Sequence, residues 1–203
     1  KQYSDFRVML EKEKGIDAVV IATPDHVHAV ASMMAIKMGK HVYCEKPLTH
    51  TVFEARALAK AASEAKVVTQ MGNQGSSAEG VRLACEWIWN GEIGEVTKIE
   101  AYTNRPIWPQ GLVAPTEVVP VPDTLKWDLF IGPAKFRAYN PAFHPWIWRG
   151  WWDYGTGALG DMACHVMHPI FTAMKLQYPI KVIGSSTQLM PDCAPTAELV
   201  HLT

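Results

Sequence analysis

Three short apolar segments, separated by two segments of helical spacing, constrain the fold of this chain more than any other feature. The first, residues 18–22, is a continuous apolar run closed by the letters TPD. A short apolar run without alternation is typical of a strand buried on both faces of a parallel sheet. Residues 41–45 (HVYCE) and 66–72 (KVVTQMG) are the other two predicted strands. Strands and helices that alternate with short joins predict right-handed βαβ units, and therefore an α/β fold with a parallel sheet.

The two helices between these strands carry their own start and stop signals. Residues 27–40 have helical spacing, and Gly39 near the end of this segment is a typical stop. Thr51 and Glu54 have the spacing of a capping box, which predicts a helix that continues through about Ala65.

The pattern changes after residue 74, which predicts two domains, residues 1–74 and residues 75–203. In the second domain, residues 77–94 (SAEGVRLACEWIWNGEIG) are typical of an amphipathic helix. Residues 95–105 (EVTKIEAYTNR) alternate and predict a strand with one wetted face.

The rest of the second domain is predicted more coarsely. Residues 106–123 are rich in proline and apolar residues without a period, which predicts a long loop. A helix over about residues 156–176 and a strand near residues 180–188 follow. The last residues, AELVHLT, also resemble part of a strand.

Composition excludes some classes of function. The chain has 203 residues, a formal net charge of −1 and 48% hydrophobic residues. No basic stripe suited to nucleic acid is present, and no apolar stretch is long enough to span a bilayer. We therefore expect neither nucleic acid nor membrane as a partner. The four cysteines form no C-x-x-C pair, and we expect thiols rather than disulfides.

Lys46 lies where chemistry is expected in such a sheet. The letters TPD, EKP and GNQ follow the three predicted strands, and the lysine is the middle letter of EKP. In open α/β sheets, ligands bind outside the carboxyl ends of the strands. The sequence therefore predicts that Lys46 lies at the ligand-binding edge rather than on an arbitrary surface loop.

A second group of chemically active residues occurs in GALGDMACHVMHP, residues 157–169. Asp161, His165 and His168 are spaced four and three apart, so on one helix they share a face. A carboxylate one turn before a histidine can orient it and favour its protonated form, which suits a proton-transfer role. Two buried, satisfied histidines and a metal site remain alternatives, but no His-Glu-x-x-His motif supports a metal. The predicted site contains no metal.

Aromatic residues are crowded just before this segment. Trp146, Trp148, Trp151 and Trp152 fall within seven residues and flank Arg149. Large rings usually fill cores, but here a sugar ring could stack on one of them while the guanidinium meets a hydroxyl or phosphate. Both interpretations stay open on the sequence.

The segments IATPDHVH, HVYCEKPLT, MGNQG and GALGDMACH resemble the Gfo/Idh/MocA family of oxidoreductases, over about residues 4–185. The resemblance implies a Rossmann domain that binds NAD or NADP, followed by an α+β domain with an open, mostly antiparallel sheet. It implies hydride transfer between a nicotinamide and a hydroxyl carbon of a sugar, cyclitol or glycoside. The alternatives are an NAD-assisted glycoside hydrolase or epimerase without net redox change, and a non-catalytic sugar-binding module.

The resemblance also assigns roles to residues. Lys46 contacts substrate and transfers or polarises the reacting proton, His165 is the acid/base, and Asp161 completes this catalytic set. The Lys46–Pro47 peptide is expected to be cis. The resemblance implies that the cofactor is bound by Thr23, Pro24, His28, Glu45, Lys46, Pro47, Asn73, Gln74, Trp148 and Arg149. Trp108, Trp151 and His168 are the candidates for substrate contact.

We expect no G-x-G-x-x-G dinucleotide loop in this chain, and we expect that loop and its strand to precede Lys1. The chain is therefore expected to be a fragment of a longer protein. The resemblance further implies a homo-oligomer, either a dimer or a tetramer. We expect a cytoplasmic location, or an exported protein if a signal precedes residue 1.

Overall fold

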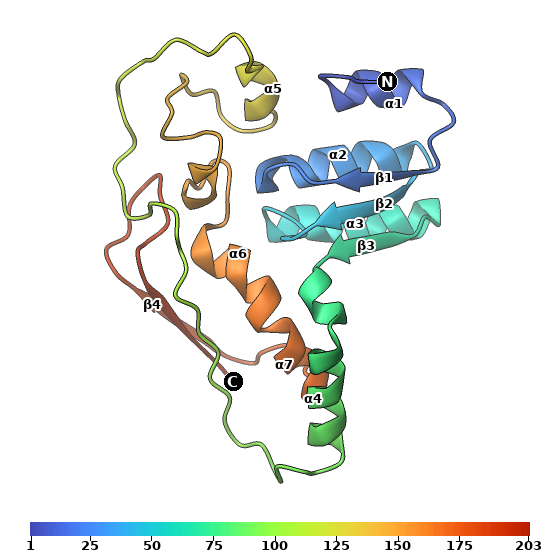
Figure 1. The fold of residues 1–203 in the computed structure, drawn as a ribbon, viewed down its shortest axis with the longest axis vertical. Coiled ribbons are helices and arrows are strands. Elements are labelled where there is room, and N and C mark those ends of the chain that lie inside the picture. The colour runs from blue at the N-terminus through green and yellow to red at the C-terminus, as the bar shows by residue number, and fades with distance from the viewer.

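The computed structural model describes residues 1–203. Its first part is a three-stranded parallel sheet, β1 (Ala18–Ile21), β2 (His41–Glu45) and β3 (Thr69–Gly72), in the order β1-β2-β3. Helix α1 (Phe6–Lys12) precedes the sheet, and α2 (Asp25–Lys37) and α3 (Val52–Ala65) join its strands (Figure 1). The predicted parallel α/β unit is confirmed.

One apolar core holds α2 and α3 against the sheet. It consists of Ile21, Val27, Ala31, Ala35, Ile36, Val42, Cys44 and Leu58. The prediction that the first strand is buried on both faces is wrong, since Val20 is 74% exposed. The side chains of neighbouring strand residues point to opposite faces, and both helices pack on the face that carries Ile21.

The predicted helix signals are present in the structure. Helix α3 begins with the complete capping box, in which Thr51 and Glu54 each accept a hydrogen bond from the other's main chain. Helix α2 ends at Lys37, and Gly39 follows with a φ of +71°. A left-handed residue after a helix is what glycine permits at least cost.

The second part begins with a 3₁₀ turn, η1 (Gln74–Ser77), and helix α4 (Glu79–Trp89), which was expected. Two strands, β4 (Val182–Ser186) and β5 (Glu198–Leu202), form an antiparallel pair. Residues 95–105 were predicted as a strand, and this is wrong. No main-chain hydrogen bond pairs that segment with another, and alternation alone cannot make a strand without a partner edge.

The predicted long loop is confirmed. Residues 106–123 contain no helix or strand, and in Figure 1 the chain from α4 to α5 (Trp127–Ile131) runs most of the length of the molecule. The predicted helix over residues 156–176 is two helices, α6 (Gly157–Val166) and α7 (His168–Ala173). Pro169, near the start of α7, has no main-chain N–H to continue the hydrogen bonding of α6.

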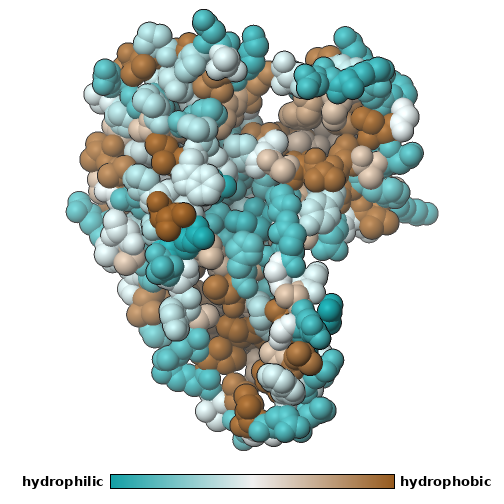
Figure 2. Space-filling view, viewed as in Figure 1, coloured by the Kyte–Doolittle hydropathy of each residue, from teal (hydrophilic) through white to brown (hydrophobic).

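A second core of mainly aromatic residues stabilises the segment before α6. Its members, which include one residue of the 3₁₀ turn η2 (Ile147–Gly150), are Trp127, Ile131, Tyr139, Phe143, Trp148, Trp151, Tyr154 and Cys193. All four cysteines are free thiols, as expected. No helix has the length and apolar character needed to cross a membrane. Figure 2 shows the face of the molecule that is seen in Figure 1. Apolar residues lie over the parallel sheet and near α7, with polar residues between them.

Candidate functional site

A cleft of about 170 Å³ lies at the carboxyl edge of the parallel sheet. Its walls come from the ends of β1 and β2, from η2 and from α6, and its lining residues are Ala22, Thr23, Asp25, Glu45, Lys46, Trp148, Arg149 and Asp161. A larger hollow of about 470 Å³ lies between α2 and α3, but eight of its ten lining residues are hydrophobic. Only the smaller cleft brings several ionisable groups together.

Lys46 and Asp161 form an ion pair in this cleft. The Nζ atom of Lys46 donates to Oδ1 of Asp161 at 2.6 Å and to the main-chain oxygen of Asp161 at 3.1 Å. Their side chains are 17% and 8% exposed, so the pair is mostly withdrawn from water. The fold thus joins two residues that lie 115 positions apart in the sequence.

Asp161 does not orient His165 as the spacing suggested. Its Oδ1 atom lies between Lys46 and Nε of Arg149, which is 3.7 Å away, and no hydrogen bond joins it to His165. Two cations outcompete an imidazole for the same carboxylate, because charge-assisted contacts are the stronger ones.

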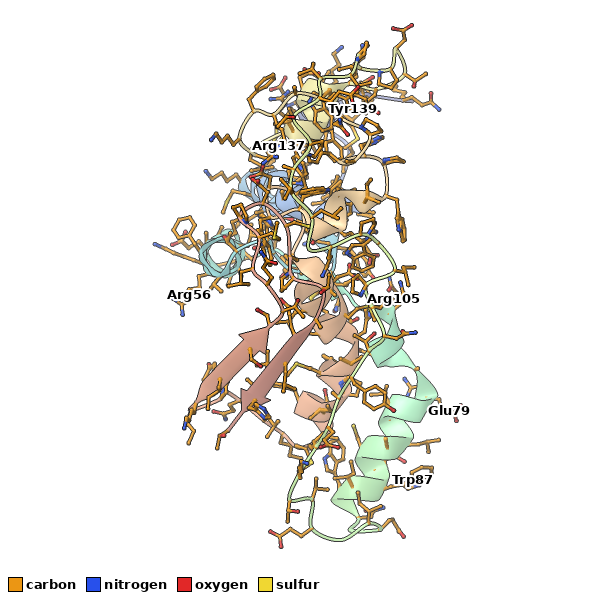
Figure 3. The ribbon with its side chains drawn as sticks, turned by 90° about the vertical axis from the view of Figure 1, so that its left-hand side faces the viewer. Arg56, Glu79, Trp87, Arg105, Arg137 and Tyr139 are labelled. Atoms are coloured by element: carbon orange, nitrogen blue, oxygen red, sulfur yellow. The ribbon has the colours of Figure 1, made fainter.

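The surroundings of His165 favour its neutral form. Burial lowers the pKa of this histidine, and repulsion by the Lys46 ammonium lowers it further, while Asp161 and Glu45 act in the opposite direction. Arg105, level with α6 in Figure 3, also lowers it. An imidazole whose pKa lies below 6.5 is a proton acceptor near neutral pH.

Arg149 is enclosed by aromatic rings. Its guanidinium carbon lies 4.1 Å from the ring centre of Trp146 and 4.4 Å from that of Trp148. Cation–π contacts at these distances restrict the guanidinium, which keeps its Nε atom near Asp161.

His28 joins two of the strand-end turns. Its Nδ1 atom lies 2.9 Å from the carbonyl oxygen of Pro47, and its Nε2 atom lies 2.8 Å from that of Thr23. The side chain is 1% exposed, and both of its nitrogen atoms lie against main-chain oxygens. Pro24 caps α2 beside Thr23, and the Lys46–Pro47 peptide is cis, as expected.

The end of β3 contributes two polar side chains. Gln74 donates from Nε2 to Oε1 of Glu45 at 2.7 Å. Asn73 donates from Nδ2 to Oγ of Ser76 at 2.7 Å and to the main-chain oxygen of Cys164 in α6. Gly72 permits the approach of Glu45, since a Cβ atom there would lie 2.8 Å from the Glu45 carboxyl carbon.

Two polar atoms at this edge are buried without a hydrogen-bond partner, Oγ1 of Thr23 and Oδ1 of Asn73. Buried polar atoms in native proteins are almost always satisfied, and an exception calls for an explanation such as a ligand. Both atoms belong to turns at the carboxyl edge, and Thr23 lines the cleft with Lys46. Thr23 and Asn73 thus leave two acceptor oxygens unused at this edge, which fits the polar part of a dinucleotide.

The predicted substrate residues do not come together at the cleft. Trp108 and Trp151 are buried, and their indole N–H groups donate to Gln110 and to the carbonyl of Ala142. His168 is exposed at the start of α7, and its side chain makes no hydrogen bond. The two tryptophans are core residues here, which is the usual place for large rings. No three His, Cys, Asp or Glu side chains converge as a metal site would require.

Asp25 is a site residue that the sequence reasoning missed. It is 2% exposed, lines the cleft, and accepts at Oδ2 a hydrogen bond from the hydroxyl of Thr156 at 3.0 Å. Burial raises the pKa of this carboxyl group, and the Thr156 hydrogen bond opposes the rise. The sequence feature that could have identified Asp25 is its position directly after Thr23-Pro24 at the end of the first strand. A charged residue there begins the next helix at the ligand-binding edge of the sheet.

Residues 155–160 read GTGALG, which matches the G-x-G-x-x-G pattern, but their structural context differs from a dinucleotide loop. They open α6, yet no strand precedes them, because residues 147–150 form the 3₁₀ turn η2. The glycines permit close packing instead. A Cβ atom on Gly155 would lie 2.5 Å from the carbonyl oxygen of Arg149, and one on Gly160 would lie 2.5 Å from Oγ1 of Thr156.

Comparison with known proteins gives two family matches. Residues 1–73 match the profile described as oxidoreductase family, NAD-binding Rossmann fold. Residues 91–203, more than half of the chain, match that of the C-terminal α/β domain of the same family.

Individual relatives agree with these matches. The chain is 29% identical over 164 residues to levoglucosan dehydrogenase of Pseudarthrobacter phenanthrenivorans, covering 81% of the chain and 34% of that protein. It is 34% identical over 99 residues to 2,7-anhydro-N-acetylneuraminate hydratase of Escherichia coli, covering 49% and 26%. A crystal structure of an NAD binding oxidoreductase from Klebsiella pneumoniae superposes with a TM-score of 0.59 at 28% identity, covering 93% and 42%.

The chain thus spans about a third of the length of the dehydrogenase and less than half of that crystal structure. Both domain profiles match, the parallel sheet has the fold that the first profile names, and Lys46 and Asp161 meet at its carboxyl edge. This chain belongs to the Gfo/Idh/MocA family of oxidoreductases.

Proposed function

We propose that the protein containing this chain is an NAD-dependent oxidoreductase that oxidises a hydroxyl carbon of a sugar, cyclitol or glycoside. The observation that carries the proposal is the ion pair between Lys46 and Asp161 in a polar cleft at the carboxyl edge of the sheet. A lysine held by an ion pair in such a cleft can hydrogen-bond a substrate oxygen, and a histidine one turn beyond Asp161 on the same helix can accept a proton.

Each group has a distinct task in this proposal. The Lys46 ammonium donates a hydrogen bond to the reacting hydroxyl oxygen and stabilises negative charge as it develops there. Asp161 holds the ammonium in place, and Arg149 in turn restrains Asp161. The neutral imidazole of His165 accepts the hydroxyl proton. The carbonyl product then forms by loss of a hydride from carbon.

The cofactor would be held by the polar groups at the same edge. Thr23 and Asn73 would satisfy their unpartnered oxygens on the nicotinamide end, and Glu45 with Gln74 would approach its ribose. Trp148 would border the pocket, with Arg149 beside it. When bound, the nicotinamide supplies the hydride acceptor.

A redox-neutral reaction at the same site is the second candidate. The relative from Escherichia coli is named a hydratase rather than a dehydrogenase, although it matches at comparable identity. In a redox-neutral cycle the hydride returns to the sugar after a bond has been changed, so the same Lys46 and His165 would serve both candidates.

The test uses the full-length protein, whose bound nucleotide is identified after denaturation and whose NADH production is followed with anhydro-sugars, cyclitols and glycosides. Lys46→Met should lower the rate by about 10²- to 10⁴-fold. Lys60→Met is the matched control, because Lys60 is an exposed helix residue paired only with Glu64.

The outcomes separate the candidates. Stoichiometric NADH supports the dehydrogenase, and sugar turnover without NADH supports the redox-neutral cycle. Sugar binding that needs no nicotinamide and survives Lys46→Met would indicate a binding module and contradict both.

A further inference from the structure

The turn that leads into α6 is held by side chains of the parallel-sheet part at three successive residues. The carbonyl oxygen of Tyr154 lies 3.2 Å from Nδ1 of His26, and that of Gly155 lies 3.1 Å from Nε2 of His50. The hydroxyl of Thr156 donates to Asp25 at 3.0 Å. Residues 154–156, called here the α6 turn, therefore bind the first part of the chain through side chains from two strand ends.

The Thr156–Asp25 bond is the member of this set closest to the chemistry. Thr156 precedes the first residue of α6, and Asp25 lines the cleft with Lys46 and Asp161. Gly160 allows the threonine side chain to pack against the helix, since any Cβ atom there would overlap it. The hydroxyl is thus held in one orientation, and a carboxylate acceptor makes the bond charge-assisted.

Helix α6 connects the Thr156–Asp25 hydrogen bond to the ion pair between Lys46 and Asp161. Asp161 is five residues beyond Thr156 within α6, which corresponds to about 7.5 Å along a helix axis. A helix of this length moves as one rigid body, so a displacement of its first turn also displaces Asp161. A displacement of Asp161 by about 1 Å away from Lys46 would lengthen the 2.6 Å contact beyond the usual hydrogen-bond range.

We propose that Asp25 and Thr156 are positioning residues whose hydrogen bond sets the start of α6 so that Asp161 meets Lys46. This inference rests on the proposed function, because it concerns the same site. Neither residue needs to touch the substrate for this role. Removal of the bond should reduce the rate of the chemical step and leave nucleotide binding little changed.

The test compares substitutions in the full-length protein. Thr156→Val keeps the shape and removes the donor, and should lower kcat by about 10- to 100-fold with little change in the KM for NAD. Thr156→Ser keeps the hydroxyl and should restore most of the rate. Thr172→Val is the matched control, because Thr172 bonds only to the main chain of its own helix α7.

A double-mutant cycle isolates the bond itself. If Asp25 and Thr156 act through one hydrogen bond, the double variant Asp25→Ala/Thr156→Val should lose no more rate than Asp25→Ala alone. Additive losses would overturn the proposal. Should Thr156→Val fail to fold, Thr156→Ala replaces it in the same cycle.

A structural readout decides the inference independently of activity. In a crystal structure of the Thr156→Val variant, the distance from Lys46 Nζ to Asp161 Oδ1 should increase beyond hydrogen-bonding range. A contact kept at 2.6 Å overturns the proposal whatever the rate. If the unaltered protein turns over no sugar with NAD, the proposed function fails, and this distance still decides whether Asp25 and Thr156 position the pair.

Discussion

Asp161 serves two cations with one oxygen atom. Lys46 approaches it at 2.6 Å and Arg149 at 3.7 Å, while His165, one turn further along α6, donates no hydrogen bond to it. The carboxylates of Asp161 and Glu45 raise the pKa of His165 through their charge, and burial together with the Lys46 ammonium outweighs them. The Lys46 ammonium is thus fixed in the cleft, and His165, which does not line the cleft, has a lowered pKa.

The pH dependence of turnover should report His165. Because burial and Lys46 lower the pKa of His165, its proton-accepting form is lost only at pH values below the ordinary 6.5. The oxidation rate should therefore be flat near neutral pH and fall on the acid side. The pH profile of kcat measures this.

A matched pair of histidines tests that assignment. His165→Gln should lower the rate by about 10²- to 10⁴-fold and remove the acid limb of the profile. His168→Gln, three residues on and exposed, should leave both unchanged. An acid limb that survives in His165→Gln would contradict the assignment of the base.

At the scale of elements, the α6 turn needs glycine at position 155 because another segment of the main chain lies against it. Gly155 approaches the main chain of Arg149, and a Cβ atom there would lie 2.5 Å from its carbonyl oxygen. Because main-chain atoms cannot rotate away as a flexible side chain can, a larger residue must displace either η2 or the turn. Each displacement would alter the start of α6 and therefore the site.

Gly155→Ala should thus lower the free energy of unfolding by between about 1 and 3 kcal/mol. Gly80→Ala, in the exposed first turn of α4 with nothing near its Cβ position, should instead be neutral or raise it by about 0.5 kcal/mol. Urea unfolding of the two variants measures both effects. A neutral Gly155→Ala would show that the turn can rearrange.

At the scale of the whole molecule, His26 is a buried connection between the two parts of the chain. Its Nε2 atom lies 2.8 Å from the carbonyl oxygen of Phe130, and its ring packs against those of Phe130 and Tyr154. Burial lowers the pKa of His26, with the two main-chain carbonyls opposing the change. The folded state therefore disfavours the protonated imidazole relative to the unfolded chain.

This pKa shift predicts how stability depends on pH. In the unfolded chain a histidine takes up a proton as the pH falls through 6.5, but folded His26 does so only at lower pH. The unfolded state then binds more protons, so the free energy of unfolding should fall as the pH decreases below 6.5. His26→Gln should be less stable at pH 7 yet show a weaker dependence between pH 7 and pH 5.

Urea unfolding at several pH values measures this difference, and it isolates His26 because the other titrating groups are shared. His201→Gln is the control, since His201 is exposed on β5. A pH dependence in His26→Gln equal to that of the unaltered protein would contradict the prediction.

The sequence by itself determined the local elements and the position of one catalytic candidate. The apolar runs, the Thr51 capping box and Gly39 specify strands and helices through contacts between near neighbours, and these predictions are confirmed. The carboxyl-edge rule located Lys46, because parallel topology brings strand ends to one side. The division into two domains and the roles of the site residues stay predictions.

Only the tertiary structure decided which of these side chains are partners. Asp161 accepts a hydrogen bond from Lys46 rather than from His165, and Asp25 accepts one from Thr156. Trp108 and Trp151 are buried in the core. Each pairing joins or excludes groups far apart in sequence, so it depends on how α6 docks on the sheet. Spacing along one helix can say which residues share a face, but not which charges oppose that face. The absent strand at residues 95–105 has the same cause, because a strand exists only where another strand pairs with it.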